Sequence, residues 1–595
     1  MTSPPRPSVW FRALLVLCAL KIALLIVTFD PSGLIAFDLP KSLASRATAC
    51  PIAIVLAILL IEHGRSIVPR SRLHVAVVGV VATWLIAATV AQDRYLALFG
   101  EDDRYLGLTY LADMTILYVA CAVAVRDVRD AKLLFAAIAI GAAVSLGYAG
   151  AQAIGADPFW WQDAPATRPF STFGNPDHFG HFLSVLFGLS FGAAVAARGV
   201  VGIATGALGV GASLAAASIV ATRGTALGII ASVVVAPIAA RARWRAVVGS
   251  AVIWLALVAI FTTTPLGERV RATLAGAQME DRATVYAASL RAFAARPIAG
   301  YGPDNFRIAY AQHRPSPAEV PSATTPQSSA HNWILDAAVM TGSLGLIALL
   351  ALVVVGTVDL IALARRLPGV GLPLLLCWCA YWAHALVAVG SIAIGWVPPV
   401  ALGVAVGLGP RAPLQRIRRV PRWASALALI ATIVVAATGA RVFLANRDAL
   451  VMEHASAVGD ARGALVAAES AVTRDSARAE NWNRLGIALD GLELWRASLD
   501  AYREAAARRP YEPIYWANVA RSHARLALAG DAGAREAAIA AARRAVDADP
   551  NSAVAHSVLS EIATAFGMCD LARSEAAIAA TFGRTDLVAR AAACR

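Results

Sequence analysis

A polar stretch between about Thr264 and Asn332 interrupts a sequence that is otherwise rich in apolar residues. Its two ends are RATVYAASLRAFAARPIAGYGPDNF, residues 282–306, and SAHNWILDAAVMTGSLGL, residues 329–346. Arginines, tyrosines, a Gly-Tyr-Gly turn and a His-Asn pair collect there, whereas a passive connector between two helices needs only a short loop. We therefore interpret this stretch as the site of chemistry.

Arginines in this stretch and in two earlier connections between apolar runs favour an anionic substrate. A guanidinium binds phosphate bidentately and stays charged at any physiological pH, which suits a pyrophosphate group better than a neutral molecule. The candidates are Arg168, Arg223, Arg282, Arg291 and Arg314. Arg223 is the most informative, because it lies between two apolar runs, where a positive charge is costly to desolvate. Snorkelling of its side chain to the membrane surface is the alternative interpretation.

His331 is the candidate for proton transfer. Near neutral pH an imidazole can take a proton from an attacking hydroxyl or donate one to a phosphate oxygen. Asn332 beside it and Asp336 one turn later would share a helix face with it, or Asn332 would simply cap the start of that helix.

For each of three other groups of residues, a functional interpretation competes with a simpler structural one. Asp177, His178 and His181 would form a metal site, but histidines at a membrane rim also fit interfacial hydrogen bonding. The acidic run 101–103 suits a metal or a solvated loop, and the aromatic residues 159–161 suit sugar stacking or, more simply, the aromatic belt of a membrane protein. We predict no metal site and no cofactor.

The composition excludes a soluble globule for the first three quarters of the 595 residues. Hydrophobic residues make up 58% of the chain and charged residues 15%, and the mean hydropathy is +0.63. A formal net charge of +13 would suggest nucleic acid in a soluble protein, but much of the arginine excess lies in short loops between apolar runs, where it sets topology. We predict a polytopic membrane protein without a nucleic-acid partner.

About thirteen apolar runs have the length of a membrane span. They lie near residues 10–29, 47–61, 74–91, 108–125, 133–154, 178–197, 199–221, 225–240, 246–263, 333–364, 370–392, 395–409 and 424–444. The loops after the second, fourth, eighth, tenth and twelfth runs are rich in arginine and are therefore predicted to be cytoplasmic. This topology places the N-terminus in the cytoplasm and the polar stretch and the C-terminal tail outside.

From about Asn446 the chain changes to alanine-rich amphipathic segments that recur with the spacing of tetratricopeptide repeats. The first copy contains Trp482, Leu485, Gly486, Tyr502, Ala505 and Pro510; the second begins at Trp516, Val519 and Ala520; the third contains His556, Leu559, Ala572 and Ala579; and a weaker copy covers 455–471. A helical bundle without true repeats is the alternative. The spacing of Cys569 and Cys594 leaves their pairing open.

Several of these segments together resemble the O-antigen ligase and polymerase superfamily of bacterial envelope glycosyltransferases. The resemblance covers roughly residues 70–400 and rests on TFGNP at 172–176, TRG at 222–224 and the two ends of the polar stretch. It implies an all-α, polytopic, GT-C-like bundle over residues 1–445 with a large periplasmic loop at 264–332. A periplasmic tetratricopeptide domain at 446–595 is a known variation in that family.

The resemblance also implies a reaction. A glycan would move from undecaprenyl pyrophosphate to an acceptor hydroxyl at the periplasmic face of the bacterial inner membrane, with inversion and without metal. Arg223 and Arg282 would neutralise the leaving pyrophosphate, and His331 would contact the acceptor or the phosphate. The remaining predicted substrate-binding residues are Arg168, Asn175, Arg291, Tyr301, Asn305 and Asn332. Asp177 departs from the family, which commonly has a second asparagine after Asn-Pro.

The acceptor stays open between a lipid core, a growing glycan and a protein hydroxyl, so a polymerase and a protein O-oligosaccharyltransferase are alternatives to a ligase. The repeats favour a protein partner, because solenoids present concave binding surfaces. A transporter or flippase would place ionisable residues within spans; the candidates are Lys21, Asp113, Asp359 and His384. A scaffold that only needs a membrane anchor would not require thirteen spans.

Overall fold

The structure is a computed structural model that describes residues 9–102, 104–161, 168–241, 243–274, 279–316, 326–411, 413 and 422–594. Every regular element within these residues is helical, which confirms the predicted all-α fold class.

Thirteen helices form an apolar bundle. They are α1 (Val9–Val27), α2 (Asp38–His63), α3 (Leu73–Thr89), α5 (Leu108–Ala124), α6 (Val128–Ala153), α7 (Pro176–Ala196), α8 (Val200–Val220), α9 (Arg223–Ala239), α10 (Trp244–Thr263), α14 (Trp333–Arg366), α15 (Pro368–Ala385), α16 (Val397–Gly407) and α17 (Arg422–Ala457). The short elements beside it are α4 (Arg94–Phe99), α11 (Pro265–Leu274), α12 (Met279–Ala295), α13 (Phe306–His313) and the 3-10 turns η1 (Gly64–Ile67) and η2 (Ser171–Phe173).

Each predicted apolar run coincides with one of these helices. Eight of the described helices are long and apolar enough to cross a membrane: α1, α2, α6, α7, α8, α10, α14 and α17. Helices α3, α5, α9 and α16 are shorter and apolar, and α15 lies on the remaining run. The chain is thus a multi-pass membrane protein, and thirteen as the number of crossings stays a prediction.

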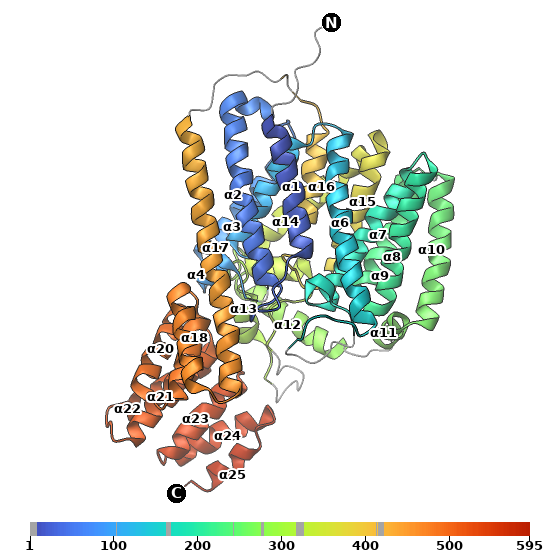
Figure 1. Cartoon of the computed structure of the whole chain (residues 1–595). Coiled ribbons are helices and arrows are strands. Elements are labelled where there is room, and N and C mark those ends of the chain that lie inside the picture. The colour runs from blue at the N-terminus through green and yellow to red at the C-terminus, as the bar shows by residue number, and fades with distance from the viewer. Residues whose placement is uncertain are drawn as a thin grey trace.

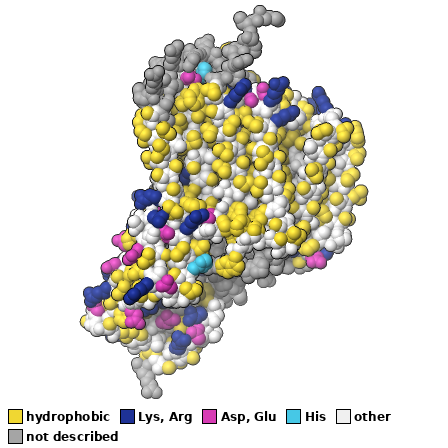
Figure 2. All heavy atoms as spheres, viewed as in Figure 1, with side chains coloured by type: hydrophobic (Ala, Val, Ile, Leu, Met, Phe, Trp, Pro, Cys, Tyr) yellow, Lys and Arg dark blue, Asp and Glu magenta, His cyan; other side chains and the backbone are white. Residues whose placement is uncertain are grey.

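The two ends of the bundle differ. Figure 1 shows the start of α1 at one end, and α11, α12, α13 and the C-terminal helices at the other. Figure 2 shows a face of the bundle that is covered by hydrophobic side chains, with charged side chains concentrated at its ends and on the C-terminal helices. This distribution is what a bilayer requires of a helix bundle.

Helix α7 lies at the centre of the part of the bundle that carries the site, packed against α8, α9 and α15. Gly188 and Gly192 face the backbone of α15, where a Cβ would overlap Leu376 and Pro373. Small residues allow such close backbone approach between membrane helices. The N-terminal end of α7 is thereby held beside the start of α9 and the end of α15.

The C-terminal helices form a solenoid that begins without a linker, because α17 continues from the bundle to Ala457 and packs on the first solenoid helix. The solenoid helices are α18 (Ala461–Arg474), α19 (Ala479–Asp490), α20 (Trp495–Arg508), α21 (Pro513–Leu528), α22 (Ala534–Ala548), α23 (Ala553–Ala565), α24 (Cys569–Thr581) and α25 (Asp586–Ala592).

Equivalent contacts recur from one helix pair to the next. Trp482 Nε1 and Trp516 Nε1 each donate to a carbonyl six residues earlier, at 2.9 Å, and His556 Nε2 bonds the Pro550 carbonyl at the same offset, 2.8 Å. The guanidinium groups of Arg508 and Arg544 lie over the Trp482 and Trp516 rings, both at 4.8 Å. These repeated contacts confirm the register of the tetratricopeptide prediction. Cys569 and Cys594 form a disulfide that joins α24 to the end of α25.

Candidate active site

Two glycine-containing motifs hold the ends of the polar stretch together. Helix α14 is interrupted at Gly342, whose φ of 64° and ψ of −167° are not helical, and this interruption faces the turn at 297–302. Four backbone hydrogen bonds join the two, from Ser343 N to Pro297 O (2.7 Å), Leu344 N to Ile298 O (3.3 Å), Tyr301 N to Val339 O (3.0 Å) and Gly302 N to Met340 O (2.9 Å). The turn that follows α12 is therefore fixed against the first part of α14.

Replacing Gly342 by alanine is expected to weaken this joint. A Cβ there would overlap the Ile298 carbonyl, and a positive φ is strained for any residue with a Cβ. We expect a loss of about 2–4 kcal/mol of unfolding free energy, measured by thermal unfolding of the full chain in detergent. Gly147→Ala is the control, because nothing lies within 4 Å of its Cβ position; equal stability of the two variants would contradict the joint.

His331 lies between two anchored residues. The buried Asp336 carboxylate accepts hydrogen bonds from Ser329 Oγ and Ala330 N, both at 2.7 Å. Asn332 caps α14, because its Oδ1 accepts from Ile334 N at 2.9 Å. His331 itself has a φ of 55°, a left-handed conformation that is uncommon for non-glycine residues but that histidine adopts more often than most.

Arg223 is the first residue of α9, and close helix packing fixes its position. Gly180 of α7 lies on the hydroxyl of Thr222, where a Cβ would overlap it, and the His384 ring packs on Gly224. Tight contacts therefore surround the backbone on both sides of Arg223, while its own side chain stays half-buried at the end of the bundle.

Arg168 and Arg282 each bond a carbonyl at that same end. Arg168 Nη1 donates to Val220 O at 3.3 Å, at the last turn of α8, and Arg282 Nη2 donates to Val387 O at 3.2 Å, just after α15. A guanidinium has five N–H donors in a fixed fork, so each bond orients the remaining donors.

These segments bring three other arginines and one carboxylate within electrostatic range of Arg223. Arg223 interacts with Arg282, Arg269 and Arg168, and with the carboxylate of Asp177. Asp177 is exposed at the first turn of α7, next to Asn175, which caps that helix by accepting from Asp177 N at 2.7 Å. One carboxylate among four guanidinium groups leaves a local excess of positive charge, which favours binding of an anion.

His331 belongs to the same group of charges. Burial and the charge of Arg282 lower the pKa of its imidazole below the ordinary 6.5, whereas Asp336 and Asp177 act in the opposite direction. The ring is therefore neutral at pH 7 and able to accept a proton.

Three of the predicted substrate-binding residues lie elsewhere in the polar stretch. Tyr301 is buried, and its hydroxyl bonds His313 Nε2. Asn305 is fully buried and bonds the backbone of Asp93, just before α4. Its Oδ1 accepts from Asp93 N at 2.8 Å, and its Nδ2 donates to Asp93 O at 3.1 Å. Arg291 acts electrostatically on His313. Their observed contacts support the scaffold, and substrate contact by them stays a prediction.

Two members of the charged cluster were missed by the sequence interpretation. Arg269 lies on α11, an amphipathic helix. The helical spacing of its apolar residues could have shown that Arg269 lies on the polar face. Asp177 was considered as a metal ligand and as a departure from the family motif, but not as a partner of the arginines. Its proximity to Arg168, Arg223 and His331 arises from packing of α7 against α9 and has no signal in the linear sequence.

The described residues do not support the metal interpretations. No three His, Cys, Asp or Glu side chains in the described ranges are arranged to hold a metal ion. His181 is buried, with its Nε2 3.1 Å from Tyr381 O and its ring stacked on His384 at 4.2 Å. Glu101 and Asp102 pair with arginines of the solenoid, and residue 103 lies outside the described part of the chain.

Two of the ionisable residues inside the bundle, Lys21 and Asp113, are joined through Ser45. Lys21 Nζ donates to Ser45 O (2.5 Å) and Ser45 Oγ (2.8 Å), and Ser45 Oγ donates to Asp113 Oδ2 at 2.9 Å. All three side chains are buried. Buried charges are usually paired, so the contacts among Lys21, Ser45 and Asp113 are explained without a transport path.

The solenoid docks on the same end of the bundle through buried ion pairs. Arg478 donates to Asp102 Oδ1 at 2.5 Å and to the Tyr105 hydroxyl. Arg509 lies 3.2 Å from Oε1 of Glu101 in the bundle and 2.6 Å from Oε1 of Glu480 in the solenoid itself. Glu101 and Asp102, just after α4, therefore form a docking element.

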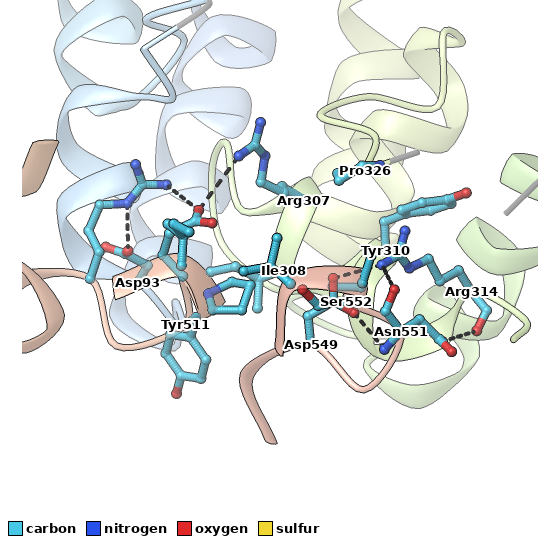
Figure 3. A pocket seen from close by; sticks show the side chains of 17 residues that line it. Asp93, Arg307, Ile308, Tyr310, Arg314, Pro326, Tyr511, Asp549, Asn551 and Ser552 are labelled. Carbon is cyan, nitrogen blue, oxygen red and sulfur yellow. Dashed lines mark hydrogen bonds and ion pairs between the residues drawn. The ribbon is translucent and has the colours of Figure 1, made fainter. Parts of the chain in front are cut away.

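A second contact joins α13 to the solenoid. Arg314 Nη2 pairs with Asp549 Oδ2 at 2.7 Å and donates to Asn551 O at 2.6 Å. Figure 3 shows these residues around a cavity of about 270 Å³ between the two parts, together with Arg307 and Tyr511. Arg314, a candidate phosphate ligand from the sequence, thus contributes to the interface.

Comparison with known proteins agrees with this description. Residues 201–350 match the family model described as O-Antigen ligase, a segment that contains Arg223, Arg269, Arg282 and His331. The resemblance inferred from the motifs is therefore confirmed. No curated protein matches the chain.

Similar solved structures are short repeat proteins. The crystal structure of MamA is 17% identical, with 24% of this chain and 80% of that chain covered and a TM-score of 0.21. A thermophilic TPR protein in Thermus thermophilus is 19% identical, with 29% and 95% covered and a TM-score of 0.23. The repeat assignment of residues 446–595 rests on the helix pairs of the chain itself.

Proposed function

We propose, from the O-antigen ligase domain at residues 201–350, that this chain transfers a glycan from an undecaprenyl-pyrophosphate carrier to an acceptor hydroxyl at the periplasmic face of the bacterial inner membrane. The family supports a membrane glycosyltransferase of the ligase or polymerase kind. The observation that carries the proposal is the grouping of Arg168, Arg269 and Arg282, each from a separate segment, around Arg223, with Arg282 also acting on His331.

The proposed periplasmic orientation has two supports. The described arginine-rich loops that follow α2, α5, α9 and α14 lie at the end opposite the candidate site (Figure 1), as expected of cytoplasmic loops. The solenoid carries the Cys569–Cys594 disulfide, and structural disulfides persist in oxidising compartments. A donor at that face is linked to lipid, because nucleotide sugars are cytoplasmic.

In the proposed reaction the acceptor hydroxyl oxygen attacks the anomeric carbon of the donor from the side opposite the pyrophosphate. The new C–O bond forms as the bond to the phosphate oxygen breaks, and that electron pair leaves with the pyrophosphate. The arginines stabilise the developing negative charge, which is the largest contribution such a site can make. Neutral His331 takes the hydroxyl proton, and the anomeric configuration is inverted.

The direct test is transfer in a purified system. The full chain in detergent is incubated with a lipid-pyrophosphate-linked glycan and EDTA, and the products are identified by mass spectrometry. Separate reactions contain a lipid-core acceptor, a second lipid-linked glycan or a protein, so that ligase, polymerase and protein-transferase activities are distinguished. Absence of any product with all three acceptors would contradict the proposal.

The lowered pKa of His331 predicts the pH dependence of this activity. Because only the neutral ring accepts a proton, the rate should be constant above pH 6.5, the ordinary histidine value, and should fall below it as the ring becomes protonated. In His331→Gln the residual rate should lose this acid limb. His523→Gln is the control, since burial also lowers the pKa of His523 but it lies in the solenoid; an unchanged acid limb in His331→Gln would exclude the base role.

A further inference from the structure

A cavity of about 620 Å³ lies beside the start of α7, between the bundle and the beginning of the solenoid. Its aromatic lining comes from Phe37, Trp160, Trp161 and Phe170, and the facing wall comes from Glu453 and His454 of α17. The volume is in the range of small-molecule and cofactor sites. Gly174 and Pro176 also line it, so the cavity borders the segment that carries Asn175 and Asp177.

The aromatic wall is held in place by one carboxylate. Asp157 accepts hydrogen bonds from Trp161 Nε1 at 3.0 Å, Tyr148 Oη at 3.0 Å and Gln152 Nε2 at 2.9 Å. The ring of Trp161 packs on Phe37 at 4.9 Å and on Phe170 at 5.6 Å. These contacts fix the rings before any ligand arrives.

The opposite wall is fastened by contacts between the first outer loop and α17. Arg447 pairs bidentately with the buried carboxylate of Asp30, both bonds at 3.0 Å. Asn446 Oδ1 accepts from Ile35 N at 2.9 Å, and Leu34 N donates to Asn446 O at 3.2 Å. The cavity therefore depends on residues from both the bundle and the helix that leads into the solenoid.

Trp160 differs from the rest of the lining because 73% of its surface is exposed. Its ring lies edge-on to His454, with centroids 6.3 Å apart. A tryptophan of the membrane belt would face lipid headgroups, whereas Trp160 faces polar residues at the end of α17. Glu453 also brings a carboxylate, which pairs with Arg484 at 3.3 Å.

We infer that this cavity binds sugar rings of the transferred glycan or of the acceptor. The C–H faces of sugars carry partial positive charge and pack on the electron-rich faces of aromatic rings, while Glu453 and His454 offer hydrogen-bonding partners for sugar hydroxyls. An isoprenoid chain would gain nothing from those two polar side chains. The inference rests on the proposed glycosyl transfer and gives it a specificity site next to the arginine cluster.

The test measures binding separately from transfer. The probe is the surface glycan of the bacterium from which the protein comes. The glycan is released by mild acid, so that it carries neither pyrophosphate nor lipid. Its affinity for the full chain in detergent is followed by microscale thermophoresis. Trp160→Ala should weaken binding about tenfold, as expected for loss of an aromatic anchor, and Trp160→Phe should restore most of it.

Trp244→Ala is the matched control, because Trp244 is 69% exposed and lies on α10 away from the cavity. Arg282→Ala should bind this probe as the wild type does while losing transfer, which separates failure of this inference from failure of the proposed function. The KM values for donor and for acceptor are then measured in Trp160→Ala. A raised KM for the donor assigns the bound sugar to the transferred glycan, and a raised KM for the acceptor assigns it to the acceptor. Wild-type affinity in Trp160→Ala, or competition by undecaprenyl phosphate without sugar, would overturn the inference.

Discussion

Arg282→Ala is expected to lower the rate of glycan transfer about 10³-fold while the protein is produced and folded normally. Arg282 comes from the polar stretch, interacts with Arg223 across the site and donates to Val387 O. Removing a positive charge aimed at a leaving phosphate typically costs this much. Transfer is measured with a lipid-pyrophosphate-linked glycan, and protein level and thermal unfolding are measured on the same preparations.

Two variants sharpen this prediction. Arg282→Lys keeps the charge but loses the planar fork, so its rate should lie between those of the wild type and the alanine variant. Arg590→Ala, a change of an exposed arginine on α25 whose side chain is 66% accessible, should transfer normally. An Arg282→Ala protein with a wild-type rate would refute the arginine-cluster mechanism.

Arg509→Ala is expected to loosen the solenoid from the bundle and to destabilise the protein by about 3–5 kcal/mol, the usual cost of breaking a buried ion pair. Without Arg509 the carboxylates of Glu101 and Glu480 lose a buried cation at 3.2 and 2.6 Å. The effect is measured by thermal unfolding and by the rate of limited proteolysis near residue 457, where α17 ends.

One change away from the interface and one double change at the interface provide controls for that measurement. Arg503→Ala removes a half-exposed arginine whose ion pair with Asp500 lies within α20, and should change stability by less than about 1 kcal/mol. Combining Glu101→Gln with Arg509→Gln should cost less than the sum of the single changes, because the pair is removed together. Proteolysis of Arg509→Ala at the wild-type rate would show that the ion pairs do not hold the solenoid.

The docked solenoid changes the role expected of the repeats. The sequence suggested a module for protein partners, but its inter-repeat turns near Arg478, Arg509 and Asp549 contact the bundle and α13. Part of one solenoid edge is therefore occupied within the chain. Removal of residues 446–595 would leave Glu101, Asp102 and Arg314 without these partners, so loss of activity after such a deletion would not by itself show that the repeats bind substrate.

Much of the architecture followed from periodicity and composition alone. Apolar runs, arginine-rich loops and the repeat of large and small residues depend on local spacing along a helix, which a linear sequence shows directly. The motifs at 297–302 and 329–346 were also recognisable, because Gly342 and the Gly-Tyr-Gly turn occupy positions whose backbone conformation favours glycine.

The sequence by itself determined that the chain is an all-helical membrane protein with a repeat domain, and that Arg223, Arg282 and His331 are the candidates for chemistry. Only the tertiary structure brought Arg269 and Asp177 to the same place, assigned Glu101 and Asp102 to the solenoid arginines, and formed the aromatic cavity. The physical reason is that helix periodicity is a property of neighbouring residues, whereas the partner of a charge depends on which helix ends packing brings together.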